Sequence, residues 1–250
     1  MMPGVGVKPV LRASGLSKRF VLHNQGGVEL PVLEGVAFEA FPGECIALDG
    51  PSGAGKSTLL KLIYANYRAS TGSVHVRHDD GVQAGAEVDM TRASAQTLLA
   101  VRRSTIGYVS QFLRTVPRVG SLDVVAEPLL AGTGADPEAL RDAHRQAQDL
   151  LLRLRIPQRL WHVAPATFSG GEQQRINLAR SFVRDWPVLL LDEPTASLDA
   201  SNSATVVALI NEVRKRGTTV IGIFHDAHIR EQVATRVLDM GCFQPGPRSR

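Results

Sequence analysis

The chain has 250 residues, of which 44% are hydrophobic and 21% are charged, and its formal net charge at pH 7 is +4. This composition is ordinary for a globular protein with a sizeable core. The densest basic runs, Arg102–Arg103 and Arg214–Arg216, are interpreted as solvated helix faces, so we expect no nucleic-acid partner. Two cysteines, Cys45 and Cys242, argue against a disulfide framework. Because no apolar run reaches the roughly 18 residues of a membrane span and the N-terminus lacks a signal-peptide core, we expect a cytoplasmic protein without membrane insertion.

The first half of the chain predicts mainly strands. The pattern at Val21–Leu33 predicts two strands around a Gly-Gly turn, and the apolar run at Cys45–Leu48 predicts a buried strand. Apolar residues at helical spacing predict a helix over Lys56–Asn66. Next we expect a strand at Gly72–Arg77 and a polar loop at His78–Asp89. A helix at Ser94–Arg103 and a strand at Ile106–Val109 follow.

From Phe112 to Ala179 the pattern becomes helical. Asp136 followed by Pro137 is a good helix start, with the acid as cap and proline in the first turn. One apolar face is predicted to contain Leu140, Ala143, Ala147, Leu150, Leu151 and Leu154. A strand, a helix and a strand then follow at Val188–Leu191, Ala200–Lys215 and Thr218–Phe224. This alternation predicts an α/β fold with a parallel sheet.

A glycine-rich stretch, GPSGAGKST, follows the buried strand and opens the first helix. It fits the phosphate-binding pattern G-x-x-x-x-G-K-[ST], in which backbone N–H groups and a helix N-terminus face phosphate oxygens. We expect Lys56 to reach the β- and γ-phosphates and the Ser57 hydroxyl to bind Mg²⁺. The predicted nucleotide-binding residues are Gly50, Pro51, Ser52, Gly53, Ala54, Gly55, Lys56, Ser57 and Thr58.

Two carboxylates end the apolar strand VLLLDE. Asp192 is positioned to hold Mg²⁺ through water, and Glu193 to polarise the attacking water. Adjacent strand residues point to opposite sides, so the two acids can have two roles. ATP and Mg²⁺ are therefore the expected cofactors.

A third motif, FSGGEQQR at Phe168–Arg175, lies between the phosphate loop and the acidic strand end. A Ser-Gly-Gly turn opening a helix there has little use inside one nucleotide site. It is better explained as the part that covers a nucleotide bound to a second copy of the chain. The order of the three motifs therefore suggests ATP hydrolysis by a head-to-tail pair.

These residues together resemble the ABC ATPase family, and the resemblance covers Leu11 to about Met240. It implies a P-loop NTPase of ABC type, with a mainly parallel core, an N-terminal antiparallel β subdomain and an inserted helical subdomain. We expect a single domain over residues 1–250. The core with its β subdomain would cover about 10–111 and 180–240, the helical subdomain about 112–179, and a loose tail 241–250.

The resemblance also implies roles for individual residues. Gln111 would sense the γ-phosphate and Mg²⁺, His225 would be the switch histidine, and Phe20 would stack on adenine. Phe168 and Glu172 stand where the family usually has Leu and Gln. The signature residues expected near the partner's ATP are Phe168, Ser169, Gly170, Gly171 and Glu172, and the loop expected at the dimer interface contains Ser197, Leu198 and Asp199.

Four segments that ATP chemistry does not require resemble a narrower family, the L-type ATP-binding subunits of the bacterial carbon–phosphorus lyase system. They are Val21–Leu33, Ile63–Tyr67, Val109–Arg118 and Gln158–Arg175. This resemblance implies a homodimer, or a heterodimer with a second ABC subunit, that works with a soluble complex. That complex forms ribose 1-phosphonate 5-triphosphate from ATP and phosphonate.

An alternative reading is the ATPase subunit of a lipoprotein or macrolide exporter, because the ATPase motifs are the same. Residues Phe112–Pro128 would separate the two readings, since this surface would receive a membrane-domain helix in a transporter. A nucleotide-binding regulator without hydrolysis is disfavoured, because Glu193 and His225 are both present.

Overall fold

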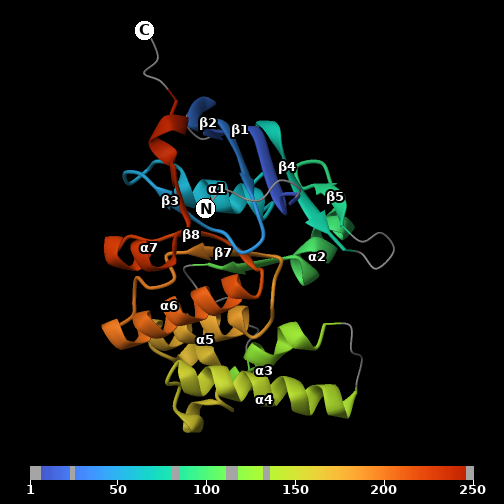
Figure 1. The fold of residues 1–250 in the computed structure, drawn as a ribbon, viewed down its shortest axis with the longest axis vertical. Coiled ribbons are helices and arrows are strands. Elements are labelled where there is room, and N and C mark those ends of the chain that lie inside the picture. The colour runs from blue at the N-terminus through green and yellow to red at the C-terminus, as the bar shows by residue number, and fades with distance from the viewer. Residues whose placement is uncertain (1–6, 23–25, 80–84, 111–117, 132–135, 246–250) are drawn as a thin grey trace.

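The computed structural model describes residues 7–22, 26–79, 85–110, 118–131 and 136–245. An antiparallel sheet has the strand order β2-β1-β4-β5, and a parallel sheet has the order β6-β7-β8-β3-β9 (Figure 1). The strands are β1 (Leu11–Leu22), β2 (Val28–Ala40), β3 (Cys45–Asp49), β4 (Thr71–His78), β5 (Ala86–Asp89), β6 (Ile106–Val109), β7 (Val188–Asp192), β8 (Thr219–Ile223) and β9 (Arg236–Asp239). The α-helices are α1 (Lys56–Ile63), α2 (Ala95–Ser104), α3 (Ser121–Ala126), α4 (Pro137–Arg153), α5 (Gly170–Phe182), α6 (Ala200–Lys215) and α7 (Ala227–Val233). Short 3-10 helices lie at Glu127–Leu129, Gln158–Leu160, Pro165–Thr167 and Met240–Phe243.

The parallel sheet is buried on both faces. Every residue of β7 and β8 is buried. Val188 and Leu190 belong to one apolar cluster, with α1 and the antiparallel sheet, whereas Leu189 and Leu191 belong to another, with α5 and α6. This is the alternation expected of successive strand residues. Helix α1 therefore lies on one side of the sheet and α5 and α6 on the other, as Figure 1 shows.

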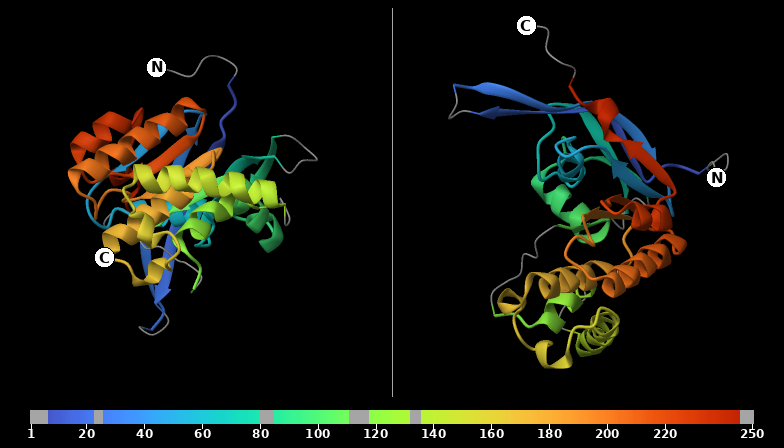
Figure 2. Two further views of the ribbon diagram at one scale, coloured as in Figure 1. Left: turned by 90° about the horizontal axis from the view of Figure 1, so that it is seen from below. Right: turned by 90° about the vertical axis from the view of Figure 1, so that its left-hand side faces the viewer.

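The N-terminal sheet confirms the predicted hairpin. Strands β1 and β2 pair in antiparallel fashion from Leu11 opposite Ala40 to Leu22 opposite Val28. Gly26 and Gly27 have left-handed φ values of 69° and 76° in the turn. Figure 2 shows the end of this hairpin projecting from the body of the molecule.

Two predictions in the first half of the chain were wrong in part. Ala86–Asp89 was expected to be polar loop, but it forms the edge strand β5, which pairs with His75–His78 of β4. Polar residues are tolerated there because one side of an edge strand faces solvent. Helix α1 ends at Ile63 rather than Asn66, and Ala65 has a left-handed φ of 56°.

Two further predictions, in the second half, need correction. Asp136 caps α4 as predicted, but Leu140 is 41% exposed, because the buried stripe of that helix begins one turn later, at Ala143. The predicted loose tail begins as a 3-10 helix over Met240–Phe243, with Met240 buried and Asp239 capping the turn.

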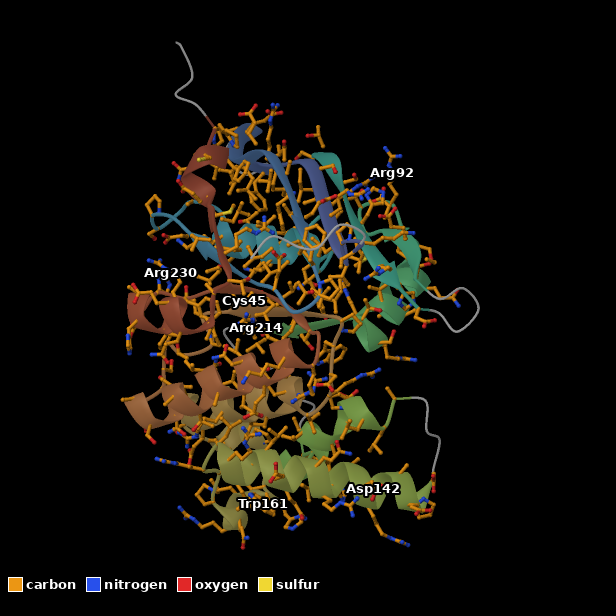
Figure 3. The ribbon with its side chains drawn as sticks, in the orientation of Figure 1. Cys45, Arg92, Asp142, Trp161, Arg214 and Arg230 are labelled. Atoms are coloured by element: carbon orange, nitrogen blue, oxygen red, sulfur yellow. The ribbon has the colours of Figure 1, made fainter. Side chains whose placement is uncertain are left out.

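Arg214 was expected to be solvated, but it is partly buried and connects three elements. Its guanidinium donates to the carbonyl oxygens of Gly43 at 3.3 Å and Val233 at 2.7 Å. Figure 3 places it just below Cys45, in the middle of the molecule. Burial raises the pKa of the Cys45 thiol to about 12, against a smaller opposing effect of Arg214. Cys45 and Cys242 are both thiols, as the cysteine count predicted.

None of the helices in the described ranges has the length and apolar character needed to cross a membrane.

The close approach of β1 and β4 gives a testable consequence. Gly72 and Gly35 both have left-handed φ values, 82° and 69°, so alanine at either should cost about 1–2 kcal/mol of strain. Only at Gly72 would the added Cβ overlap backbone, at the carbonyl of Gly15, which should cost about 1–3 kcal/mol more. Urea unfolding of Gly72→Ala and Gly35→Ala measures the difference. Equal losses of unfolding free energy would contradict this packing.

Candidate nucleotide site

The phosphate loop joins the end of β3 to the start of α1. Gly50, Gly53 and Gly55 have φ values of 136°, 82° and 82°, which L side chains rarely adopt. Gly55 is the N-cap of α1, and no side chain caps that helix. The first N–H groups of α1 are therefore available to an anion, which is the arrangement that favours phosphate.

Gly55 also has no room for a side chain. A Cβ there would lie 2.5 Å from Cδ2 of the buried Leu33, so with any other residue either this side chain or the loop must shift. The ammonium of the next residue, Lys56, donates to the carbonyl oxygens of Gly50 at 2.6 Å and Pro51 at 2.9 Å. The positive charge of Lys56 therefore lies over the phosphate loop.

The phosphate loop and the acidic strand end meet through a hydrogen bond. The Ser57 hydroxyl donates to Oδ1 of Asp192 at 2.9 Å, and the Tyr108 hydroxyl donates to Oδ2 at 3.0 Å. Asp192 is only 6% exposed. Burial, and then the charge of Asp192, raise the pKa of Tyr108, so this phenol stays protonated and donates.

Ser57 and Asp192 fit the requirements of magnesium. In the part of the chain that the structure describes, no group of three or more His, Cys, Asp or Glu side chains could hold a metal. Mg²⁺ commonly keeps several waters and substrate phosphates and takes only one or two protein oxygens. A hydroxyl beside a buried carboxylate is a suitable pair of oxygens.

The side chains of Glu193 and His225 are in contact at the same edge of the parallel sheet. Strands β7 and β8 are in register with Asp192 opposite Ile223, so the residues that follow the two strands come together. Nε2 of His225 lies 2.7 Å from Oε1 of Glu193. Glu193 has a left-handed φ of 55°, a strained conformation that turns its side chain at the strand end.

Phe20 lies on β1 and is partly buried. Its ring meets Tyr67 edge to face, with 5.3 Å between ring centroids, and the Lys18 ammonium lies 4.6 Å from its centroid. The predicted adenine role of Phe20 is not tested by these contacts. The contacts also bring in Tyr67, which belongs to none of the three ATPase motifs.

The Ser-Gly-Gly signature forms the start of α5. Ser169 is the N-cap, and its backbone N–H and hydroxyl both donate to Oε2 of Glu172, at 3.0 and 2.7 Å. These hydrogen bonds lower the pKa of Glu172. A capping box therefore explains the acid in place of the family's usual Gln, since a carboxylate also suits the positive end of a helix. Ser169 and Gly170 are exposed.

The loop after the acidic strand lies beside the signature of the same chain. A Cβ on Gly171 would be 3.3 Å from the carbonyl oxygen of Ser197. Leu198 is partly buried against the helical core, and Asp199 caps α6 by accepting from the N–H of Asn202 at 2.7 Å. An open cavity of about 630 Å³ borders Glu193, Leu198 and His225.

Helix α5 connects the signature to the segments that follow β7 and β6. The amide of Gln174 donates to the Pro194 carbonyl at 3.5 Å, and that of Asn177 donates to the Ser110 carbonyl at 2.7 Å. Ser110 precedes Gln111, which lies outside the described residues, as do Phe112–Pro117. The role predicted for Gln111 therefore stays a prediction.

Sequence reasoning selected most of these residues but missed Tyr108. A signal was present, since Tyr108 lies on the strand predicted at Ile106–Val109 and precedes Gln111 by three positions. Its hydroxyl became relevant only once the register placed it near Asp192.

Comparisons with known proteins identify the family. The family model described as "ABC transporter" matches residues 33–196. The chain belongs to this family. It is an ABC ATPase, and the antiparallel subdomain, parallel core and helical insertion are those of the ABC type.

Individual relatives agree with this assignment. A lipoprotein-releasing system ATP-binding protein, LolD, of Idiomarina loihiensis is 35% identical over 225 residues, which cover 90% of this chain and 91% of that protein. A macrolide export ATP-binding/permease protein, MacB, of Wolinella succinogenes is 33% identical over 93% of this chain. The chain spans about a third of that relative's length, since the match covers 33% of it.

A solved structure of similar fold is the dimeric post-hydrolysis state of the ATP-binding cassette MJ0796 bound to ADP and Pi. Its TM-score is 0.78 at 26% sequence identity, and the match covers 92% of this chain and 95% of that one.

The contact between Glu193 and His225 leads to a test of the chemical step. Glu193→Gln keeps the size and a hydrogen-bonding oxygen of the side chain but removes a base, so hydrolysis should slow by about a hundredfold or more. ATP affinity, measured by calorimetry, should stay near that of wild type. Glu231→Gln, at an exposed position on α7, is the matched control and should hydrolyse normally. Near-normal turnover in Glu193→Gln would reassign the base.

Proposed function

We propose that this chain hydrolyses Mg-ATP at the edge of its parallel sheet, with the residues described above in distinct roles. The observation that carries the proposal is the hydrogen bond of Ser57 to Asp192. It joins the phosphate loop to the acidic strand end in one site, with Glu193 next in the chain.

Each residue has a task that its position allows. The N–H groups at the start of α1 bind phosphate oxygens, and Lys56 exchanges its two carbonyl partners for phosphate. Ser57 and Asp192 hold Mg²⁺, which when bound neutralises charge on the phosphates. Glu193 accepts a proton from the attacking water, and His225 orients the Glu193 carboxylate.

We infer that a working site needs two chains. The signature helix α5 and the phosphate-loop helix α1 lie on opposite faces of the parallel sheet. Among the described residues, no hydrogen bond or ion pair joins Phe168–Glu172 to Gly50–Thr58. Ser169 and Gly170 are exposed, so this turn is placed to cover a nucleotide held by another chain. The dimeric state of the MJ0796 cassette supports this arrangement.

The relatives favour a membrane transporter as the partner of the pair. LolD is of similar length to this chain and belongs, by name, to a lipoprotein-releasing system, and MacB to macrolide export. In this proposal the surface around residues 112–128 receives a helix of the membrane component. An identity of 35% over 90% of this chain supports a system of this type.

A second candidate partner is a soluble phosphonate-processing complex. Its support is the resemblance of the four segments that ATP chemistry does not require. One of them, Ile63–Tyr67, brings two tyrosines to the C-terminal end of α1, where Tyr64 packs against Tyr108 and Tyr67 packs against Phe20. This segment therefore contacts Phe20, the residue expected to stack on adenine, and Tyr108, which donates to Asp192.

Growth of a gene-deletion strain separates the two candidates, given a parent strain that grows on methylphosphonate. A phosphonate-pathway partner predicts lost growth on methylphosphonate as sole phosphorus source and normal growth on phosphate. A transporter partner predicts normal growth on both, with the protein recovered in the membrane fraction.

Complementation supplies the control for this experiment. The wild-type gene should restore the lost growth, and the Glu193→Gln gene should not, because the partner needs hydrolysis. Normal growth of the deletion strain on methylphosphonate would refute the phosphonate candidate.

A further inference from the structure

Tyr108 makes a contact that none of the three motifs requires. Asp192 has two carboxylate oxygens, and each accepts one hydroxyl, from Ser57 on α1 and from Tyr108 on β6. The carboxylate is therefore held from two elements at once. A carboxylate has about four lone-pair directions, so two remain for a metal or its waters.

The register of the sheet explains why Tyr108 reaches Asp192. Strands β6 and β7 are parallel, with Tyr108 opposite Leu190. Leu190 and Asp192 are two positions apart, so their side chains leave the same face of the sheet. Diagonal neighbours of this kind lie about 7–8 Å apart, which an aromatic side chain can span. That face is the one covered by α1, where Ser57 lies.

The ring of Tyr108 is itself held in place. Tyr64, at the C-cap of α1, packs against it at a tilted angle, with 5.0 Å between ring centroids. The Arg102 guanidinium lies 4.7 Å from the Tyr64 centroid, and its Nε donates to the Tyr64 carbonyl at 3.0 Å. The direction of the Tyr108 hydroxyl is therefore restrained, because Tyr64 packs against the ring that carries it and Arg102 of α2 in turn holds Tyr64.

We propose that Tyr108 is a positioning residue for magnesium, whose hydroxyl fixes the orientation in which Asp192 presents its remaining lone pairs. The proposal rests on the proposed ATPase function of this site. A phenol suits the task because it donates without adding a charge, so the carboxylate stays negative. Partners of this type, which orient a metal-binding group, commonly contribute tenfold or more to metal affinity.

Tyr108→Phe tests this directly, because it keeps the ring against Tyr64 and removes only the hydroxyl. Tyr64→Phe is the matched control, since it removes one hydroxyl from the same pair of rings without touching Asp192. In the Glu193→Gln background, Mg²⁺ is titrated against the ATP complex by calorimetry. Tyr108→Phe should weaken Mg²⁺ affinity by roughly tenfold, and Tyr64→Phe should leave it unchanged.

A second readout separates positioning from a structural defect. With the native Glu193, excess Mg²⁺ should restore turnover of Tyr108→Phe to near that of wild type, whereas limiting Mg²⁺ should reveal a several-fold loss. The melting temperature should fall by roughly a few degrees, because a buried carboxylate loses one donor, and the variant should remain folded under the assay conditions. Equal Mg²⁺ affinities for Tyr108→Phe and Tyr64→Phe, or a defect that excess Mg²⁺ does not relieve, would overturn the proposal. If wild type itself showed no hydrolysis, the proposed function would fail instead.

Discussion

The buried carboxylate of Asp192 holds this site together. It ends a strand whose residues are all buried, and it accepts hydrogen bonds from the phosphate-loop helix and from the neighbouring strand. A buried carboxylate is stable only when its lone pairs are satisfied. The position of α1 over the sheet, and so the position of the phosphate loop, is tied to that requirement.

The two-sided burial of the parallel sheet has a second consequence. Each face must be covered by helices, so the element that binds phosphate and the element that carries the signature are separated by the sheet itself. One chain cannot fold its signature over its own phosphate loop without breaking this packing. The ABC arrangement therefore makes association of two chains the natural way to complete the site.

Much of this architecture could be predicted from the sequence. Buried strands, cap residues and glycine-rich turns have strong local signals, and β6, α6 and the Asp136 cap agree with the structure. Strand β5 was missed because its polar residues pair only with β4 and pack little apolar surface. Arg214 was misjudged because its partners, Gly43 and Val233, are distant in sequence.

The residues of the site also fall into those that local motifs predict and those that only the fold brings together. The phosphate loop and acidic strand end are contiguous motifs, so their residues could be chosen one by one. Tyr108 and Tyr67 contact residues on other elements. The register of β6 and β7 brings Tyr108 to Asp192, and the position of the chain after α1 brings Tyr67 to Phe20. The partner has the weakest local signal, because the ATPase motifs are shared by ABC ATPases that serve different partners.

Mixing two inactive variants tests the two-chain site most directly. Lys56→Ala removes the phosphate-loop charge, and Gly170→Arg blocks the signature at a position where open space surrounds the glycine in one chain. Random pairing should restore about a quarter of the active sites, because half of the dimers are mixed and each contains one intact pair of halves. Hydrolysis near that level would support the account. Activity no greater than that of either variant alone, with mixed dimers shown by crosslinking, would contradict it.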